Sequence, residues 1–386
     1  MDEVALRKLA IKMYLEGKSP SKIITELNKS RPWFYKWLKR YEANPGQDWY
    51  KDHSRRPLSI KQKIDTETEN LIISFRLNLK SIRYAQIGAV SIQWEFEKLG
   101  LTPPPIWTID RVLKRNNLIR EKEKPSLKTN EYPTDYFFNV HQMDFVGPRY
   151  IKNYGRFYSL NIISTDTHCA QINPIKGKSA DFVLNAIVRF WKKFGKPDFL
   201  QMDNELSFRG SNRHPRSFGK VIRFLLSQQV APIFIPLSEP WRNGIVERFN
   251  DSFDKKFFRS QIFKDLDDVC SKATVFENFH NRHHRYSAHN NRTPLDMFIR
   301  DKHTTLLDED YEIPDEHPLI EGDIYLIRFI RSDRKLSVFS ESFIMPKELV
   351  YSYVIGLISV ESHTLKVYRD NKLIKEIYYP IPVDWM

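Results

Sequence analysis

The spacing of apolar residues changes twice along the chain, and these changes limit the folds that the chain can adopt. Residues 4–115 carry helical spacing, whereas from about residue 135 strand-like runs alternate with helical ones. From residue 318 onwards the runs are short and strand-like. The sequence therefore predicts a multidomain α+β protein, with helical domains first, an α/β core next and a small β-barrel last.

The charge of the chain narrows the class of partner. Among 386 residues, 61 Lys and Arg face 48 Asp and Glu, and the resulting net charge of +13 attracts a polyanion. No run of 18 apolar residues occurs, and the N-terminus lacks the apolar segment of a signal peptide, so we expect no membrane partner. The two cysteines, Cys169 and Cys270, lie far apart and indicate a reducing interior such as the cytoplasm.

Residues 1–50 carry three short helical patterns that predict a helix-turn-helix domain. Ser19 is a candidate N-cap before Pro20, and a third, basic helix begins at Ser30. Trp37 is expected in the core of this domain. The alternative is a small helical bundle with a solvated basic face. The exposed positions of the third helix are candidate DNA contacts: Arg31, Trp33, Lys36, Lys39 and Arg40.

A similar pattern in residues 51–120 predicts a second, winged helix-turn-helix domain. Helices are expected near 64–80 and 87–99, and the prolines at 103–105 precede a third one. Two such units in tandem would bind a long, bipartite DNA site. The candidate DNA contacts on the third helix are Trp107, Arg111, Lys114 and Arg115.

Composition suggests the remaining boundaries. Residues 121–134, with Lys122, Lys124 and Lys128, are expected to form an extended basic linker. The α/β core is expected over 135–310. Residues 318–386 are expected to form the small β-barrel, and four lysines there fit non-specific DNA binding, although a passive stabilising domain fits nearly as well: Lys335, Lys347, Lys366 and Lys372.

Three carboxylates of the core stand where elements end or begin. A strand over 137–146 carries Asp144, and a strand over 198–202 runs directly into Asp203. Glu247 lies on the helix that follows a proline-bounded loop. Carboxylates are the hard oxygen ligands that Mg²⁺ prefers, and two such ions stabilise both oxygens of an in-line phosphoryl transfer. Among 48 acidic residues, however, such triples also arise by chance.

Sequence blocks around these carboxylates resemble those of DDE transposases, the retroviral-integrase-like insertion-sequence group. The blocks are HQMD ending at Asp144, QMDN around Asp203 and NGIVERF around Glu247, and the similarity continues through residues 280–295. The resemblance implies an RNase H-like core in which the three carboxylates hold two Mg²⁺ ions, with Mn²⁺ able to substitute.

The resemblance also implies a reaction and its partners. The reaction is metal-dependent cleavage at transposon ends, followed by transfer of the 3′-OH into target DNA. The expected partners are double-stranded DNA, as terminal inverted repeats and as target, and further copies of the chain in at least a dimer. The expected location is the cytoplasm of a prokaryote, at the nucleoid.

The chain departs from the family pattern at two places. Glu205 stands where the family usually has Gly, which puts the geometry of that turn in doubt. The separation of Asp203 and Glu247 is longer than in the retroviral enzymes, and the extra residues are expected in a polar loop over 210–217 that contacts DNA.

Several other residues compete for a functional role. Asp166 follows the second strand of the core but is expected to cap a turn. Trp241 fits either packing or a wedge at the DNA end. The histidines His280, His283, His284 and His289 are expected to be solvated or to face phosphates rather than to bind a metal. The helix of Glu247 adds four candidate DNA contacts: Arg248, Lys255, Lys256 and Arg259.

Two other functions remain open on the sequence. A transposase-derived regulator would keep DNA binding and lack catalysis. An RNA-directed RNase H-like nuclease is disfavoured, because helix-turn-helix units suit the major groove of DNA better than A-form RNA.

Overall fold

The computed structural model describes residues 2–46, 48–52, 64–119, 132–133, 136–211, 213, 215–301, 304–319 and 321–382. The lysines of the expected linker, Lys122, Lys124 and Lys128, lie outside this part. The chain forms two compact units, Met1–Thr66 and Glu67–Met386. None of the described helices combines the length and the apolar character that crossing a membrane requires.

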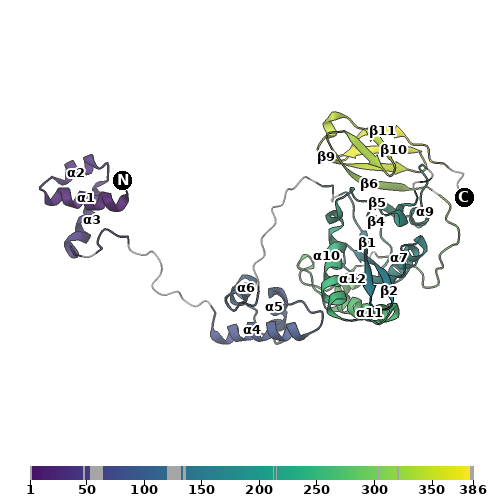
Figure 1. The fold of residues 1–386 in the computed structure, drawn as a ribbon, viewed down its shortest axis with the longest axis horizontal. Helices are drawn as coiled ribbons and strands as arrows, with labels where there is room; N and C mark the ends of the chain where they lie inside the picture. Colours follow the sequence, from purple (N-terminus) through teal and green to yellow (C-terminus); the bar gives the residue numbers. More distant parts are fainter. Residues whose placement is uncertain are drawn as a thin grey trace. The chain divides into compact units, whose positions relative to one another are not determined.

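The first unit holds three short helices, as the sequence predicts (Figure 1). These are α1 (Glu3–Leu15), α2 (Pro20–Glu26) and α3 (Arg31–Ala43). Pro20 opens α2 as expected, but the side chain of Ser19 makes no capping hydrogen bond, whereas that of Ser30 accepts one from the Trp33 backbone. Trp37 is buried, as expected for a core residue of this helical domain.

Three further helices follow at the start of the second unit. They are α4 (Thr66–Ser81), α5 (Ala89–Lys98) and α6 (Ile106–Arg115), and α6 begins directly after the proline run. Phe75 of α4 packs edge to face on Phe96 of α5. The helices confirm the predicted elements, while their use as a second helix-turn-helix stays a prediction.

A nine-stranded sheet forms the rest of the second unit, in the order β11-β10-β9-β6-β5-β4-β1-β2-β3. In its first part, β1, β2 and β3 form an antiparallel meander. β4 then pairs parallel to β1, and β5 pairs parallel to β4. These strands are β1 (Val140–Ile151), β2 (Gly155–Ser164), β3 (Ala170–Ile175), β4 (Phe199–Met202) and β5 (Ala231–Phe234). β1 extends to Ile151, beyond residue 146 where the predicted strand ends, with a register shift between Val146 and Arg149.

Helices cover both faces of this sheet, and the sheet separates two apolar clusters. One cluster joins Met143 and Met202 to α7 and α9, and the other joins Ile172 to Phe249 and Phe276. The helical elements are α7 (Ala180–Phe194), α8 (Leu206–Arg209), α9 (Lys220–Ser227), η1 (Pro240–Asn243), α10 (Gly244–Ser252), the π-helical turn η2 (Phe253–Phe257), η3 (Phe258–Ser260), α11 (Leu266–His283), η4 (Ser287–His289) and α12 (Pro294–Arg300).

The C-terminal strands continue this sheet, and the expected barrel is not found among the described strands. β6 pairs parallel to β5 through Ile233 with Tyr325 and Phe234 with Leu326. β9, β10 and β11 then add antiparallel beyond β6, so the edge of the parallel sheet is covered (Figure 1), and β7 and β8 pair in a separate two-stranded sheet. The C-terminal elements are β6 (Asp323–Ile330), β7 (Lys335–Val338), β8 (Glu341–Ile344), η5 (Lys347–Leu349), β9 (Ser352–Ser359), β10 (Thr364–Arg369) and β11 (Lys372–Tyr378).

Candidate active site

Asp144 and Asp203 occupy equivalent places on neighbouring parallel strands. Gln142 of β1 is the register partner of Gln201 of β4, and each aspartate follows two residues later. Adjacent strands lie about 4.8 Å apart, and parallel strands end at the same edge of a sheet. The two carboxylates therefore stand side by side at the carboxyl end of this strand pair.

The alternation of side chains along β1 and β4 sends both carboxylates toward the same face. Met143 and Met202 are buried in the cluster on the α7 side. Residues two apart along a strand share a face, so Gln142 and Asp144 point to the opposite side, where α10 lies. A hydrogen bond from Asn250 of α10 to Asp144 agrees with this orientation.

Glu247 reaches the site because the start of α10 is held against the same strand ends. The side-chain oxygen of Gln142 accepts hydrogen bonds from the backbone nitrogens of Ile245 and Val246, both at 3.1 Å. Asn243 donates to the Met143 carbonyl at 2.9 Å. Glu247 follows on the first turn of the helix and is half-buried.

The surroundings of the site raise the pKa values of all three carboxylates. Burial, reinforced by the charges of Asp203 and Glu247, raises the pKa of Asp144 to about 7. Burial also raises the pKa of Asp203 and of Glu247. The effect of both partners on the pKa of Asp144 agrees with the positions that β1, β4 and α10 give to the three carboxylates.

A chain of side chains that the sequence analysis did not single out orients Asp144. Asn250 donates to its Oδ2 at 2.8 Å, and Asn161 of β2 donates to the Asn250 side-chain oxygen at 2.8 Å. Ser159 in turn donates to Asn161 at 2.6 Å. Asn250 follows Glu247 by three residues on the same helix, and this helical spacing is the sequence signal that could have identified it.

The donor set fits a divalent cation of the magnesium class. Carboxylate oxygens on a half-buried, polar edge are hard ligands, and a cation would offset the burial of negative charge that raises their pKa values. Among the described residues, however, no group of three or more His, Cys, Asp or Glu side chains is already drawn together around one point.

Glu205 stands where the family pattern has glycine, and both its backbone and its side chain have partners. Its backbone nitrogen donates to Asp203 Oδ1 at 3.0 Å, and its carboxylate pairs with Lys178 at 2.6 Å. The turn after β4 therefore forms with a glutamate, whose charge is offset by a lysine.

The loop over 210–217 leaves the core where its two ends meet, and Asn212 and His214 within it lie outside the described residues. A Cβ added at Gly210 would lie 2.6 Å from the Gly219 backbone nitrogen. Gly210 also has φ +97°, which suits glycine. Because the loop closes on itself, it lengthens the sequence between Asp203 and Glu247 without moving either residue. Its Arg216 pairs with Glu341 at 2.9 Å.

The other residues that the sequence offered for a functional role are Asp166, the histidines around His280, and Trp241. Asp166 is exposed in the turn after β2, where it accepts a hydrogen bond from Thr165. His280 corrects the expectation of solvated histidines, since it is buried against Phe249 and bonds the His168 carbonyl. Burial lowers its pKa to about 4, so it is neutral near pH 7. Trp241 of η1 is 60% exposed, which excludes a packing role within the described chain.

The candidate DNA contacts of the helical regions are mostly exposed. Arg31, Lys36 and Lys39 lie on the open face of α3, whereas Trp33 is half-buried and Arg40 donates to the Lys51 carbonyl. On α6, all four candidates are exposed: Trp107, Arg111, Lys114 and Arg115. Arg115 also pairs with Glu69 of α4.

The basic residues near Glu247 differ from one another. Arg248 is exposed. Lys255 pairs with Asp251, and Arg259 pairs with Asp254, each at 2.6 Å. Lys256 does not fit a phosphate contact, because its ammonium is partly buried and donates to the backbone carbonyls of Tyr84 and Ala85.

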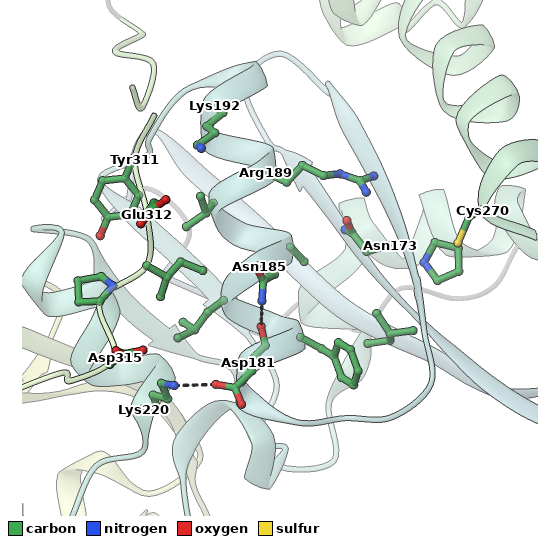
Figure 2. Close-up of a pocket in the computed structure, with 18 of the residues that line it drawn as sticks. Asn173, Asp181, Asn185, Arg189, Lys192, Lys220, Cys270, Tyr311, Glu312 and Asp315 are labelled. Carbon is green, nitrogen blue, oxygen red and sulfur yellow. Dashed lines mark hydrogen bonds and ion pairs between the residues drawn. The ribbon is translucent and has the colours of Figure 1, made fainter. Parts of the chain in front are cut away.

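A cavity of about 770 Å³ lies along α7, and none of the three carboxylates lines it. Figure 2 shows Asp181 pairing there with Lys220, and Asn185 donating to the Asp181 backbone. The segment of Tyr311 to Asp315 forms its other wall. Besides this ion pair, two further basic side chains of the lining, Arg189 and Lys192, donate to backbone carbonyls.

Comparison with known proteins adds two domain matches. Residues 1–48 match the family model of a homeodomain-like domain, and residues 228–294 match that of the integrase core domain. The second match includes β5, η1 and α10, and therefore Glu247. No curated protein matches the chain significantly.

Several solved structures are similar in fold. The catalytic core domain of HTLV-2 integrase in complex with magnesium, in its trimeric form, is 15% identical, with 42% of this chain and 95% of that chain covered and a TM-score of 0.32. The catalytic core domain of BIV integrase is 14% identical, with 43% and 96% covered and a TM-score of 0.33. A simian T-cell lymphotropic virus intasome in complex with PP2A regulatory subunit B56 gamma is 11% identical, with 76% and 93% covered and a TM-score of 0.36.

At this identity and TM-score, these likenesses alone establish nothing about activity. The two domain matches support a coarser statement, which agrees with the blocks around Asp144, Asp203 and Glu247. The chain is DDE transposase/integrase-like: it joins a homeodomain-like domain to an integrase core domain of the kind that serves transposase- and integrase-type DNA transactions.

Proposed function

We propose that the chain is a DNA transposase or integrase that cleaves transposon ends and transfers the freed 3′-OH into target DNA. The observation that carries the proposal is the register of β1 and β4, which sets Asp144 beside Asp203 at the strand ends, with the helix of Glu247 tied to the same strand. Three carboxylates in this arrangement suit metal-dependent phosphoryl transfer.

In this mechanism, Asp144 and Asp203 would share two Mg²⁺ ions and Glu247 would complete the set of ligands. When bound, the ions supply charge stabilisation for the entering and leaving oxygens of an in-line displacement. The chain contributes orientation: Asn250 and Asn161 fix the carboxylate of Asp144. The Glu205 backbone fixes one oxygen of Asp203. No protein nucleophile is required, because water and then the 3′-OH attack phosphorus.

The partners follow from this reaction. Duplex DNA would bind through the exposed basic face of α3 and the exposed end of α6, first as terminal inverted repeats and then as target. Joining requires two ends in one complex, so we expect a homo-multimer of at least two chains, working at the nucleoid.

The basic face of α3 makes a separate prediction. Replacing both Lys36 and Lys39 with Gln should reduce the slope of log affinity against log salt by about two, because each phosphate contact contributes about one. Both side chains are exposed. The measurement is a salt titration of duplex binding by fluorescence anisotropy.

Lys12 provides the matched control, since it is an exposed lysine on α1 near Glu16. Lys12→Gln should leave the slope nearly unchanged. Equal slopes for the wild type and the α3 variant would show that this face is merely solvated.

The proposed activity is tested by a strand-transfer assay with labelled duplexes taken from the DNA flanking the gene. The wild type should join these ends to a second duplex in Mg²⁺ or Mn²⁺ and not in EDTA. Tight duplex binding without cleavage or joining in either metal would instead support a regulator that lacks catalysis. Cleavage restricted to the RNA strand of a hybrid would support a nuclease.

A further inference from the structure

Arg328 of β6 extends a buried guanidinium toward the active-site turn. The residue is 4% exposed and donates to five oxygens, all of them neutral. Four are backbone carbonyls and one is the side-chain oxygen of Asn204: Ser337 at 2.9 Å, Phe234 at 3.1 Å, Ile235 at 2.8 Å, Ile327 at 2.9 Å and Asn204 Oδ1 at 2.8 Å.

Such a group is expensive to bury. Removing a charge from water and pairing it only with neutral acceptors is unfavourable, and burial lowers the pKa of Arg328 to about 9. A well-packed apolar side chain often stabilises such a place equally well. What arginine alone offers is a rigid fork that reaches several acceptors at once.

One arm of this fork ends on Asn204, the residue after Asp203. Asn204 is held at three atoms: its Oδ1 by Arg328, its Nδ2 on the Ile235 carbonyl at 2.8 Å and its carbonyl by Arg209 at 3.0 Å. The next residue, Glu205, donates to the Asp203 carboxylate. The conformation of Asp203 therefore depends on where Asn204 is fixed.

The other arm ends on Ile235, where β5 gives way to the loop that leads to Glu247. The Ile235 carbonyl accepts from both Arg328 and Asn204, which joins the two segments at one atom. The same segments, 203–206 and 235–240, line a cavity of about 440 Å³, and Asp203 is among its lining residues. Arg328 thus donates hydrogen bonds to both segments that line this cavity.

We propose that Arg328 is a positioning residue for metal binding: its fork locks the turn that carries Asp203 to the loop that leads to Glu247. This inference rests on the proposed metal-dependent function. It makes the C-terminal strands part of the framework of the active site, in addition to any contact that they make with DNA.

The test compares Arg328→Met and Arg328→Lys with a matched control, Arg216→Met. Arg216 also bridges the core and the C-terminal strands with a two-pronged contact, to Glu341 at 2.9 and 3.1 Å, but it touches neither Asn204 nor Ile235. Mn²⁺ affinity is measured on the full chain without DNA by electron paramagnetic resonance, and the melting temperature of each variant is measured in EDTA.

We expect Arg328→Met to bind Mn²⁺ at least tenfold more weakly than the wild type, the usual effect of removing a residue that orients a metal ligand. Arg216→Met should stay within about twofold. Arg328→Lys should regain melting temperature but not Mn²⁺ affinity, because a single ammonium lacks the fork that holds both segments. If Arg328→Met does not fold, the lysine variant decides.

Two results would overturn the inference. One is wild-type Mn²⁺ affinity in a folded Arg328 variant. The other is an equal loss of affinity in Arg216→Met at an equal loss of melting temperature, which would make the role of Arg328 structural. A wild type that binds Mn²⁺ but never joins DNA would contradict the proposed activity, and the comparison of variants would still decide the role of Arg328.

Discussion

Glu247→Gln should lower the rate of DNA joining by roughly a thousandfold, which corresponds to about 4 kcal/mol of transition-state stabilisation. The amide keeps the size of the side chain and removes the negative charge that a metal ligand supplies. Duplex affinity should be unchanged, because Glu247 lies on α10, in a different unit of the chain from the basic face of α3. Single-turnover strand transfer and anisotropy measure the two quantities.

Glu205→Gln is the matched control for this experiment. Glu205 is a second carboxylate close to Asp203, but Lys178 already offsets its charge at 2.6 Å. We expect a change in rate of less than about tenfold. Equal losses in both variants, or full activity in Glu247→Gln, would contradict the assignment of Glu247 as a ligand.

Asp144→Asn should make the metal-free protein more stable at pH 8. The carboxylate of Asp144 is buried among like charges, and its pKa in the folded state is about 7, above the ordinary value of 3.8. Above pH 7 this difference costs the wild type on the order of 4 kcal/mol of unfolding free energy. Asparagine removes that charge and keeps an oxygen that accepts the hydrogen bond from Asn250.

The sign of the pH dependence follows from the same shift. The folded state binds the proton more tightly than the unfolded state, so the wild type gains stability as the pH falls through 7 toward 3.8. The advantage of Asp144→Asn should therefore shrink over this window. Added Mg²⁺ should raise the melting temperature of the wild type and leave that of the variant nearly unchanged.

Calorimetry in EDTA and in Mg²⁺ between pH 5 and pH 8.5 measures both effects. Asp198→Asn serves as the control, since Asp198 is an exposed carboxylate at the opposite end of β4 from Asp203. A variant less stable than the wild type at pH 8 without metal would show that Asp144 does not carry the charge strain described here.

Local sequence pattern predicted the elements that carry the carboxylates. Strand periodicity located β1 and β4, and helical periodicity located the helix of Glu247, because these signals depend on neighbouring residues alone. The order of the three blocks then predicted that Asp144, Asp203 and Glu247 lie together, although their distance along the sequence carries no such information.

Contacts between distant segments were not predictable. The pairing of β6 with β5 replaced the expected barrel, because an edge strand can accept any strand with matching register. Arg328 belongs to a strand whose pattern alone suggests a surface position for a charged residue. Lys256 was expected on an exposed face and instead donates to the Tyr84 and Ala85 backbone, a contact that periodicity within one helix cannot reveal.

The most direct test of the metal site is anomalous diffraction from crystals of the protein grown with duplex DNA and Mn²⁺. We predict anomalous peaks bounded by the carboxylates of Asp144, Asp203 and Glu247, and their loss in the Glu247→Gln variant. Mn²⁺ bound elsewhere, or an ordered DNA complex with no peak among these three carboxylates, would contradict the account.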